Sequence, residues 1–174
     1  MPKLIKNVQE NILCEGKKVL IKKGYDKLNI REICKNCNIA TGTFYNYFSS
    51  KEDLARQIFI SDWNKSIKVI DKIKTSPKSL KEKLRALYIE LDKFISNYMS
   101  TFYELSMRKG KRNCKSHSKV YSEIEKFIDY EKERGTINST ISSKQIAEFI
   151  VHNFVCLSNT HYLTFDEFYS ILNI

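Results

Sequence analysis

Glycine and proline are scarce in this sequence of 174 residues, which contains five glycines and two prolines. Chains built from many short strands need frequent turn residues, whereas long helices need few. With 42% hydrophobic residues, the chain is also long enough to bury a core. The scarcity of turn residues therefore predicts an all-α fold made of long helices.

Long apolar runs are absent, because no run approaches the roughly 18 to 20 residues that span a bilayer. The opening stretch MPKLIKNVQENILCEGKK carries lysines throughout and lacks the unbroken apolar region of a signal peptide. We therefore expect a cytoplasmic protein with no membrane partner. Because that compartment is reducing, the odd count of five cysteines argues against a disulfide framework.

Signatures of catalysis are lacking as well. The three histidines, His117, His152 and His161, show no spacing typical of a nucleophilic or metal site. The sequence contains no glycine-rich phosphate loop and no paired carboxylates in an apolar setting. We expect no enzyme, no catalytic residue, no metal and no cofactor.

Positive charge is what the sequence has in excess. Lys and Arg total 30 against 20 Asp and Glu, which gives a net charge of +10 and a pI near 9.3. Residues 1–60 contain 11 basic and 6 acidic residues, so a third of the chain carries half of the net charge. This concentration at the N-terminal end favours a polyanionic partner such as nucleic acid.

Apolar residues recur every three or four positions along most of the chain, which is the period of an amphipathic helix. Predicted helix starts coincide with N-cap signals, in which Ser, Thr or Asn is followed three residues later by an acidic residue. These pairs are Asn29 with Glu32, Ser50 with Asp53, Ser79 with Glu82, and Thr164 with Glu167. The predicted elements span residues 3–23, 29–36, 40–47, 50–76, 79–107, 118–134, an apolar segment at 145–163, and 164–172, with a basic loop at 108–119.

The two short predicted helices at 29–36 and 40–47 are joined by a three-residue turn, which is the pattern of a helix-turn-helix. The run GYDKLNIREICKNCNIATGTFYNYFSSKEDLARQIF, residues 24–59, resembles the DNA-binding domain of the TetR family of bacterial transcriptional regulators. The resemblance extends from Ile12 to about Phe59. Its strongest part is the block Gly42, Thr43, Phe44, Tyr45, Tyr47, Phe48, Lys51, Glu52 and Leu54.

This resemblance implies an N-terminal three-helix helix-turn-helix DNA-binding domain at residues 1–50. A continuous helix would join it to a helical ligand-binding and dimerisation domain at residues 51–174. It further implies a ligand-responsive regulator, acting as a repressor, that binds a palindromic operator in double-stranded DNA as a homodimer. Binding of a small-molecule effector would release the operator.

Two residues depart from the family pattern. Asn38 replaces the usual turn glycine, and Asn tolerates the left-handed backbone that such a turn requires. Ala40 replaces the usual Ser or Thr cap of the second helix, a change that costs about 0.5 to 2 kcal/mol of helix stability. We expect either a less firmly held recognition helix or partial compensation by Thr41.

The DNA-binding residues that the resemblance implies lie in and just after the second helix. Gly42 lets the DNA backbone approach closely, and Asn46 suits an adenine edge. Tyr45 and Tyr47 suit phosphate contacts, although core packing is an open alternative for Tyr45, and Lys51 adds charge for phosphate. The full set is Thr41, Gly42, Thr43, Tyr45, Asn46, Tyr47 and Lys51, with Phe44 and Phe48 assigned to the core and Lys27, Arg31 and Lys35 read as either phosphate contacts or a solvated face.

Cys34 and Cys37 form a C-x-x-C spacing, which has two interpretations. They fall where the family usually has small apolar residues, so packing is the favoured role. A zinc site needs four ligands, and the only comparable pair, Cys114 and His117, lies in the other predicted domain. The alternative function is a thiol- or metal-responsive DNA-binding sensor that uses Cys34 and Cys37.

Two further sets of candidates lie in the C-terminal part. The apolar density of residues 145–163 favours a partner surface, with Ile146, Ile150, Phe154, Leu157, Phe165, Phe168 and Leu172 as candidates for the dimer interface. Aromatic residues at helical spacing are either ordinary core or the lining of an effector pocket. The pocket candidates are Phe94, Tyr98, Phe102, Tyr103, Tyr121, Phe127 and His152.

Overall fold

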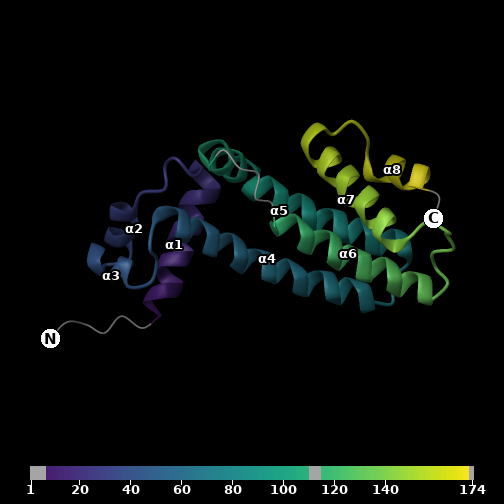
Figure 1. Ribbon diagram of the computed structural model, residues 1–174, viewed down its shortest axis with the longest axis horizontal. Helices are drawn as coiled ribbons and strands as arrows, with labels where there is room; N and C mark the ends of the chain where they lie inside the picture. The colour runs from purple at the N-terminus through teal and green to yellow at the C-terminus, as the bar shows by residue number, and fades with distance from the viewer. Residues whose placement is uncertain (1–6, 110–114, 173–174) are drawn as a thin grey trace. The chain divides into compact units, whose positions relative to one another are not determined.

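The computed structural model describes residues 7–109 and 115–172, with side chains except those of residues 99, 100 and 102–119. Within these ranges all regular secondary structure is α-helical, which confirms the predicted fold class (Figure 1). The helices are α1 (Val8–Lys23), α2 (Ile30–Asn36), α3 (Thr41–Tyr45), α4 (Lys51–Thr75), α5 (Leu80–Lys109), α6 (Lys115–Glu133), α7 (Ser143–Thr160) and α8 (Phe165–Leu172).

The chain divides into two compact units, and each unit is made of two segments. Unit 1 comprises Met1–Trp63 and Asn97–Gly110, and unit 2 comprises Asn64–Ser96 and Lys111–Ile174. Helices α4 and α5 therefore each contribute residues to both units. The unbroken α4 is the continuous helix that the sequence predicted after the helix-turn-helix, while a domain boundary at residue 50 stays a prediction.

Unit 1 contains α1, α2, α3 and the first half of α4 around one apolar core. Helix α1 presents Ile12, Gly16, Val19 and Leu20 to that core, as its sequence period predicted. A Cβ atom added to Gly16 would lie 3.0 Å from side-chain carbons of Leu54 and of Ile58. The absence of a side chain at residue 16 therefore lets α1 and α4 approach closely.

Unit 2 contains the rest of α4 and α5 together with α6, α7 and α8. Helices α6 and α7 lie side by side (Figure 1). An aromatic cluster joins α5, α7 and α8, with the Tyr88 ring 5.2 Å from that of Phe154 and 5.8 Å from that of Phe165. The Arg85 guanidinium lies 4.7 Å from the centroid of the Phe165 ring, so a cation also covers this cluster.

Local capping explains where most of the helices begin. The Asn29 side chain accepts hydrogen bonds from the backbone N–H groups of Arg31 and Glu32, which confirms the predicted cap of α2. Reciprocal bonds of the capping-box type join Ser79 to Glu82 and Thr164 to Glu167 at the starts of α5 and α8. At α4, Ser50 Oγ accepts from the N–H of Asp53, also as predicted.

Three predicted boundaries were wrong by two or three residues. The recognition helix ends at Tyr45 rather than residue 47, because residues 46–49 form a turn closed by the Phe48 N–H to Phe44 carbonyl bond of 3.0 Å. The basic loop predicted at 108–119 is shorter, since α5 extends to Lys109 and α6 begins at Lys115. Lysine, arginine and serine are polar without being strong helix breakers, so polarity alone overestimated this loop.

Within residues 7–109 and 115–172, none of the helices has the length and hydrophobicity needed to cross a lipid bilayer.

Candidate nucleic-acid interface

The turn between α2 and α3 is built by local backbone chemistry. Asn38 adopts the left-handed conformation with φ of 53°, as the sequence predicted. Ala40 is the N-cap residue of α3 and supplies no side-chain hydrogen bond. The turn is closed by backbone bonds, including 3.0 Å from the Ile39 N–H to the Cys34 carbonyl.

Helix α3 buries one face and exposes the other. Phe44 and Phe48 are fully buried, with ring centroids 5.5 Å apart, so their assignment to the core is confirmed. Tyr45 is 54% exposed and Tyr47 is 40% exposed, so the core alternative for Tyr45 does not hold. Thr41, Gly42 and Asn46 are exposed as well, and Thr43 is half-buried.

Gly42 is not required by the packing of the protein itself. A Cβ atom added at this position would meet no other atom within 4 Å. The residue is in ordinary helical backbone rather than in the left-handed region. The exposed face of α3 therefore has an open surface at Gly42 that nothing in unit 1 fills.

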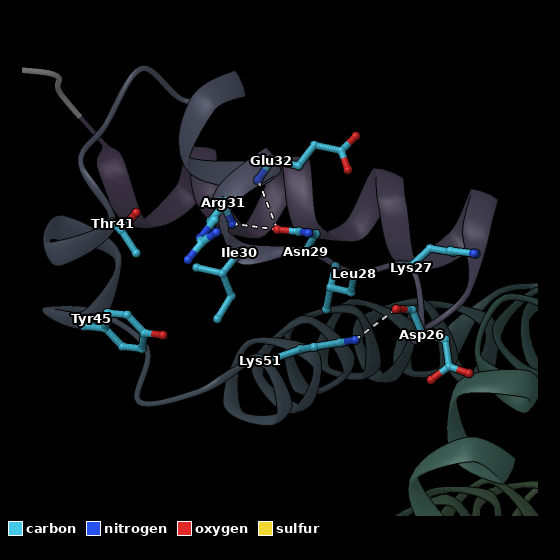
Figure 2. Close-up of a pocket in the computed structure, with 10 residues that line it drawn as sticks. All are labelled: Asp26, Lys27, Leu28, Asn29, Ile30, Arg31, Glu32, Thr41, Tyr45 and Lys51. Carbon is cyan, nitrogen blue, oxygen red and sulfur yellow. Dashed lines mark hydrogen bonds between the residues drawn. The ribbon is translucent and has the colours of Figure 1, made fainter.

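A cleft beside α3 contains several of the predicted contact residues. Figure 2 shows Thr41 and Tyr45 on one side of it and Lys51 reaching toward Asp26 from α4. Three cationic side chains line the cleft, and two acidic side chains accompany them, so the cleft carries a positive balance. The lining residues are Asp26, Lys27, Leu28, Asn29, Ile30, Arg31, Glu32, Thr41, Tyr45 and Lys51.

At the α4 side of the cleft, Lys51 and Glu52 both contact Tyr25. Tyr25 is fully buried, and its hydroxyl donates a hydrogen bond of 2.7 Å to Glu52 Oε1. That bond holds the pKa of the Glu52 carboxyl below its ordinary value. Lys51 Nζ lies 4.4 Å from the centroid of the Tyr25 ring and donates a 3.2 Å hydrogen bond to the Asp26 carbonyl.

The two cysteines of the C-x-x-C pair lie against α1 and α3. Cys34 is buried and Cys37 is half-buried, and burial raises the pKa of both thiols. A raised pKa lowers the fraction of reactive thiolate at neutral pH. In the part of the chain that the structure describes, no three His, Cys, Asp or Glu side chains are grouped to hold a metal ion. Cys114 and His117 lie outside the described side chains.

The candidates for an effector pocket are scattered in the structure. Phe127 is buried in unit 2, and Tyr98 is buried in unit 1, where its hydroxyl donates to the Asp62 carboxylate. Tyr121 and His152 pair through a contact of 3.3 Å between the hydroxyl and Nε2. Phe94 is half-buried, and the side chains of Phe102 and Tyr103 lie outside those described.

Most candidates for the dimer interface are buried in the core of unit 2, and their role in a dimer stays a prediction. They are already covered by their own chain and leave little area for a second one. The residues concerned are Ile146, Ile150, Phe154, Leu157, Phe165 and Phe168, all buried, while Leu172 is half-buried.

The exposed face of α7 is formed by different residues. Phe149, which is 49% exposed, is followed by His152 and Cys156 at steps of three and four residues, so that they share one side of the helix. On α8, Ile171 is 64% exposed. The apolar character of α7 thus extends to a surface as well as to the core.

Sequence reasoning also missed two polar networks because their members are far apart in the chain. Lys83 and Glu131 form an ion pair of 2.6 Å with both side chains buried in unit 2. Asp62 accepts from Tyr98 and lies 2.6 Å from Lys17 Nζ, so that it joins α1, α4 and α5 within unit 1. The sequence did contain one hint of a buried lysine, because Lys83 lies next to Leu84 and four residues before Leu87, on the apolar side of its helix.

Comparison with known proteins gives matches at two levels. The family model described as bacterial regulatory proteins, tetR family, matches residues 12–58. Among curated relatives, the uncharacterised HTH-type transcriptional regulator YuxN of Bacillus subtilis is 34% identical over 99 residues, which cover 53% of this chain and 34% of YuxN. The HTH-type transcriptional regulator UidR of Escherichia coli is 32% identical over 56 residues, covering 32% of this chain and 29% of UidR. The chain thus matches about a third of the length of these relatives.

Solved structures match over nearly the whole chain. A TetR/AcrR-family transcriptional regulator of Aquifex aeolicus has a TM-score of 0.67 and 24% identity, covering 95% of each chain. One from Thermobifida fusca has a TM-score of 0.65 and 18% identity, covering 95% of this chain and 93% of that chain. FadR of Bacillus subtilis in complex with stearoyl-CoA has a TM-score of 0.60 and 18% identity, with 87% and 94% covered. At these identities the likeness is one of fold.

Proposed function

Because this chain belongs to the TetR family of bacterial regulatory proteins, we propose that it is a ligand-responsive repressor that binds operator DNA through α3. The division into a DNA-binding domain at residues 1–50 and a regulatory domain at residues 51–174 is part of this proposal. The curated relatives that match are transcriptional regulators. We accordingly assign the protein no enzymatic activity.

The observation that carries the proposal is the exposed face of α3. Its aromatic and polar side chains stay in solvent while Phe44 and Phe48 anchor the opposite face. Exposed tyrosine hydroxyls are among the side-chain groups that contact DNA phosphates, and Gly42 leaves room for a close partner. A DNA major groove is wide enough to admit a helix.

Each exposed residue of this face has a proposed role. Asn46 reads a base edge, since its amide pairs bidentately with adenine. Thr43 contacts a phosphate or a thymine methyl group, and Tyr45 and Tyr47 bind phosphates. Thr41 and Gly42 lie at the N-terminal end of α3, which is the end of a recognition helix that approaches the bases. Lys51 stands at the edge of the cleft, and its ammonium group already contacts the protein.

The homodimer in this proposal forms through the exposed face of α7. We replace the buried candidates by Phe149 and Cys156, which share that face. A two-fold axis would present two copies of α3 to successive major grooves, about one helical turn apart. The operator would accordingly be palindromic.

The effector in this proposal is a small molecule bound in unit 2. It acts by binding one spacing of the two recognition helices better than the other, so that its differential affinity shifts the equilibrium. Phe94, Tyr121 and His152 are the candidates that remain at least partly accessible in unit 2.

Fluorescence anisotropy tests the proposal with DNA from upstream of the protein's own gene and a shuffled control, across a salt series. We expect selective binding that persists near physiological salt. Equal and salt-sensitive binding to the upstream and shuffled DNAs, and equally to other promoter fragments, would contradict sequence-specific regulation. The same assay then screens for release by small molecules, with stearoyl-CoA included because a structural neighbour binds it.

A further inference from the structure

Tyr25 is held from two directions by consecutive residues of α4. Tyr25 lies in the segment that links α1 to α2, its ring is fully buried, and the Lys51 ammonium faces that ring at 4.4 Å from the centroid. Its hydroxyl donates to Glu52 Oε1 at 2.7 Å. A cation over an aromatic face and a charged hydrogen-bond acceptor are both strong partners for a tyrosine.

Lys51 makes another contact to the same segment. Its Nζ donates to the backbone carbonyl of Asp26 at 3.2 Å, as Figure 2 shows. The side chain of Lys51 is half-buried in this position. A DNA phosphate would therefore have to share the ammonium group, which has three N–H donors, with the Tyr25 ring and the Asp26 carbonyl.

These contacts join residues that lie on either side of the helix-turn-helix in the chain. Tyr25 and Asp26 come just before α2, whereas Lys51 and Glu52 come just after α3. The contacts thus join the two ends of the segment that contains the helix-turn-helix. Fixing both ends of that segment restricts how α3 can rotate relative to α2.

We propose that Lys51 is a positioning residue, which clamps the first turn of α4 to Tyr25 and thereby fixes the orientation of α3, rather than a direct phosphate ligand. The inference rests on the proposed DNA-binding function for its biological meaning. The clamp itself is a property of the DNA-free protein. It is therefore tested both without and with DNA.

The first test is amide hydrogen exchange of the DNA-free protein in the variants Lys51→Met, Lys51→Arg and Lys27→Met. Lys51→Met keeps the apolar stem but removes the charge over Tyr25. We expect exchange in residues 41–50 to become about fivefold faster or more in Lys51→Met. Lys51→Arg keeps the cation and should restore protection. Lys27→Met is the matched control, since Lys27 is an exposed lysine of the same cleft. Unchanged exchange in Lys51→Met overturns the clamp, whatever the protein does with DNA.

The second test is the salt dependence of operator binding in the same variants and in Tyr25→Phe and Tyr25→Leu. Lys51→Met should lower operator affinity by about tenfold and lower the operator-to-shuffled ratio, without changing the slope of log K against log salt. Tyr25→Leu, in which the Lys51 charge is intact, should show the same loss. Tyr25→Phe keeps the ring and should lose less, which gives a folded comparison if Tyr25→Leu is unstable.

A direct phosphate contact makes the opposite set of predictions. Lys51→Met would then lower the slope by about 0.9, weaken operator and shuffled DNA equally, and differ from Tyr25→Leu. That result overturns the proposal. If the wild-type protein binds neither DNA selectively, the proposed function fails, and the exchange experiment still decides the clamp.

Discussion

At Gly42, helix stability and the proposed DNA binding favour different residues. Glycine weakens a helix relative to alanine, and no neighbouring atom prevents a side chain there. We expect Gly42→Ala to raise the free energy of unfolding by up to about 1 kcal/mol and to weaken operator binding, because its methyl group points at the proposed DNA surface. Urea denaturation and anisotropy on one preparation measure both effects.

Gly135 provides the control for that change. Its backbone has φ of +71°, in the left-handed region where alanine is strained, and it belongs to unit 2, whereas α3 belongs to unit 1. Gly135→Ala should therefore lower stability while operator affinity of the folded protein is kept. If Gly42→Ala binds the operator as tightly as the wild type, close approach at this residue is ruled out.

The cysteines should differ in reactivity according to burial. Cys14 and Cys156 are exposed, while burial raises the pKa of Cys34 and Cys37. A higher pKa leaves less thiolate at a given pH. We expect iodoacetamide at pH 7.5 to modify Cys14 before the C-x-x-C pair, as peptide mapping would show. In urea the rates should converge, and fast labelling of Cys34 and Cys37 in the folded protein would favour the thiol-sensor alternative.

Single residues whose role is local were the ones that the sequence predicted well. Asn29 caps α2 and Asn38 adopts a left-handed turn because both roles depend on the nearest few residues. The Ser142 and Gln145 capping box at α7 carried the same kind of signal, but it was not recognised at the start of the predicted segment 145–163. The role of Lys51 was not predictable, because Tyr25 is brought to it only by tertiary folding.

Three helices and a loop meet at the buried pair of Lys83 and Glu131. Lys83 Nζ also donates to the Lys74 carbonyl at 2.8 Å, and the Thr136 hydroxyl lies 2.6 Å from Glu131 Oε2. The pair thus links the end of α4 to α5, α6 and the loop that follows. Removing one partner of such a pair leaves an uncompensated charge in the core.

We expect Lys83→Met or Glu131→Leu alone to cost about 3–5 kcal/mol of unfolding free energy. The double variant should recover at least half of that loss, since two apolar side chains then pack together. Urea denaturation of the four proteins in a double-mutant cycle measures the coupling. Additive losses would mean that the two charges do not stabilise each other.

Helix α8 is attached to α5 by an exposed ion cluster. Hydrogen bonds from Arg85 and then Lys81 hold the pKa of the Asp166 carboxyl at about 2, below its ordinary value of 3.8. A lowered pKa means that the stabilising contribution is present above the ordinary value and is lost as the pH falls toward 2.

The stability difference between the wild type and Asp166→Asn should therefore be largest near pH 7 and shrink between about pH 4 and pH 2. Urea midpoints at several pH values measure it. Because the cluster is exposed, 0.5 M NaCl should also reduce the difference at pH 7. A stability difference that does not change with pH would show that ionisation of Asp166 is not its cause.

At the scale of helices, the sequence predicted where helices occur better than which side of each helix faces the core. Periodicity located all eight described helices, but α7 is apolar on several sides, and period alone does not say which side faces its own core. Phe154 packs on Tyr88 and Phe168, whereas Phe149 faces outward. The dimer candidates were therefore chosen from the side of α7 that packs on its own unit.

For the whole molecule, the proposed dimer depends on the exposed side of α7. Phe149→Glu places a charge on that side, at a half-exposed ring that also stacks on the buried Phe168 ring with 6.4 Å between centroids. We expect a monomer by analytical ultracentrifugation and a loss of affinity for a two-half-site operator on the order of 100-fold, because the two copies no longer bind as one unit.

The matched control is Ile89→Glu on α5, an exposed isoleucine outside the proposed interface. It should leave the oligomeric state unchanged. A dimer that persists in Phe149→Glu would place the interface on another surface. A monomeric wild type at micromolar concentration would contradict the dimer itself.

The discontinuity of the two units limits how this protein could be cut or recombined. The last part of α5 returns to unit 1, where the buried Tyr98 ring meets Phe59 and its hydroxyl meets Asp62. A fragment that stops at residue 63 would expose that site and leave the Asp62 carboxylate without the phenol. A hybrid regulator with a single exchange point after residue 63 would therefore combine the first part of unit 1 with a foreign end of α5, and the contacts of Tyr98 would be lost. A second exchange point near residue 97 would keep all of unit 1 from one protein.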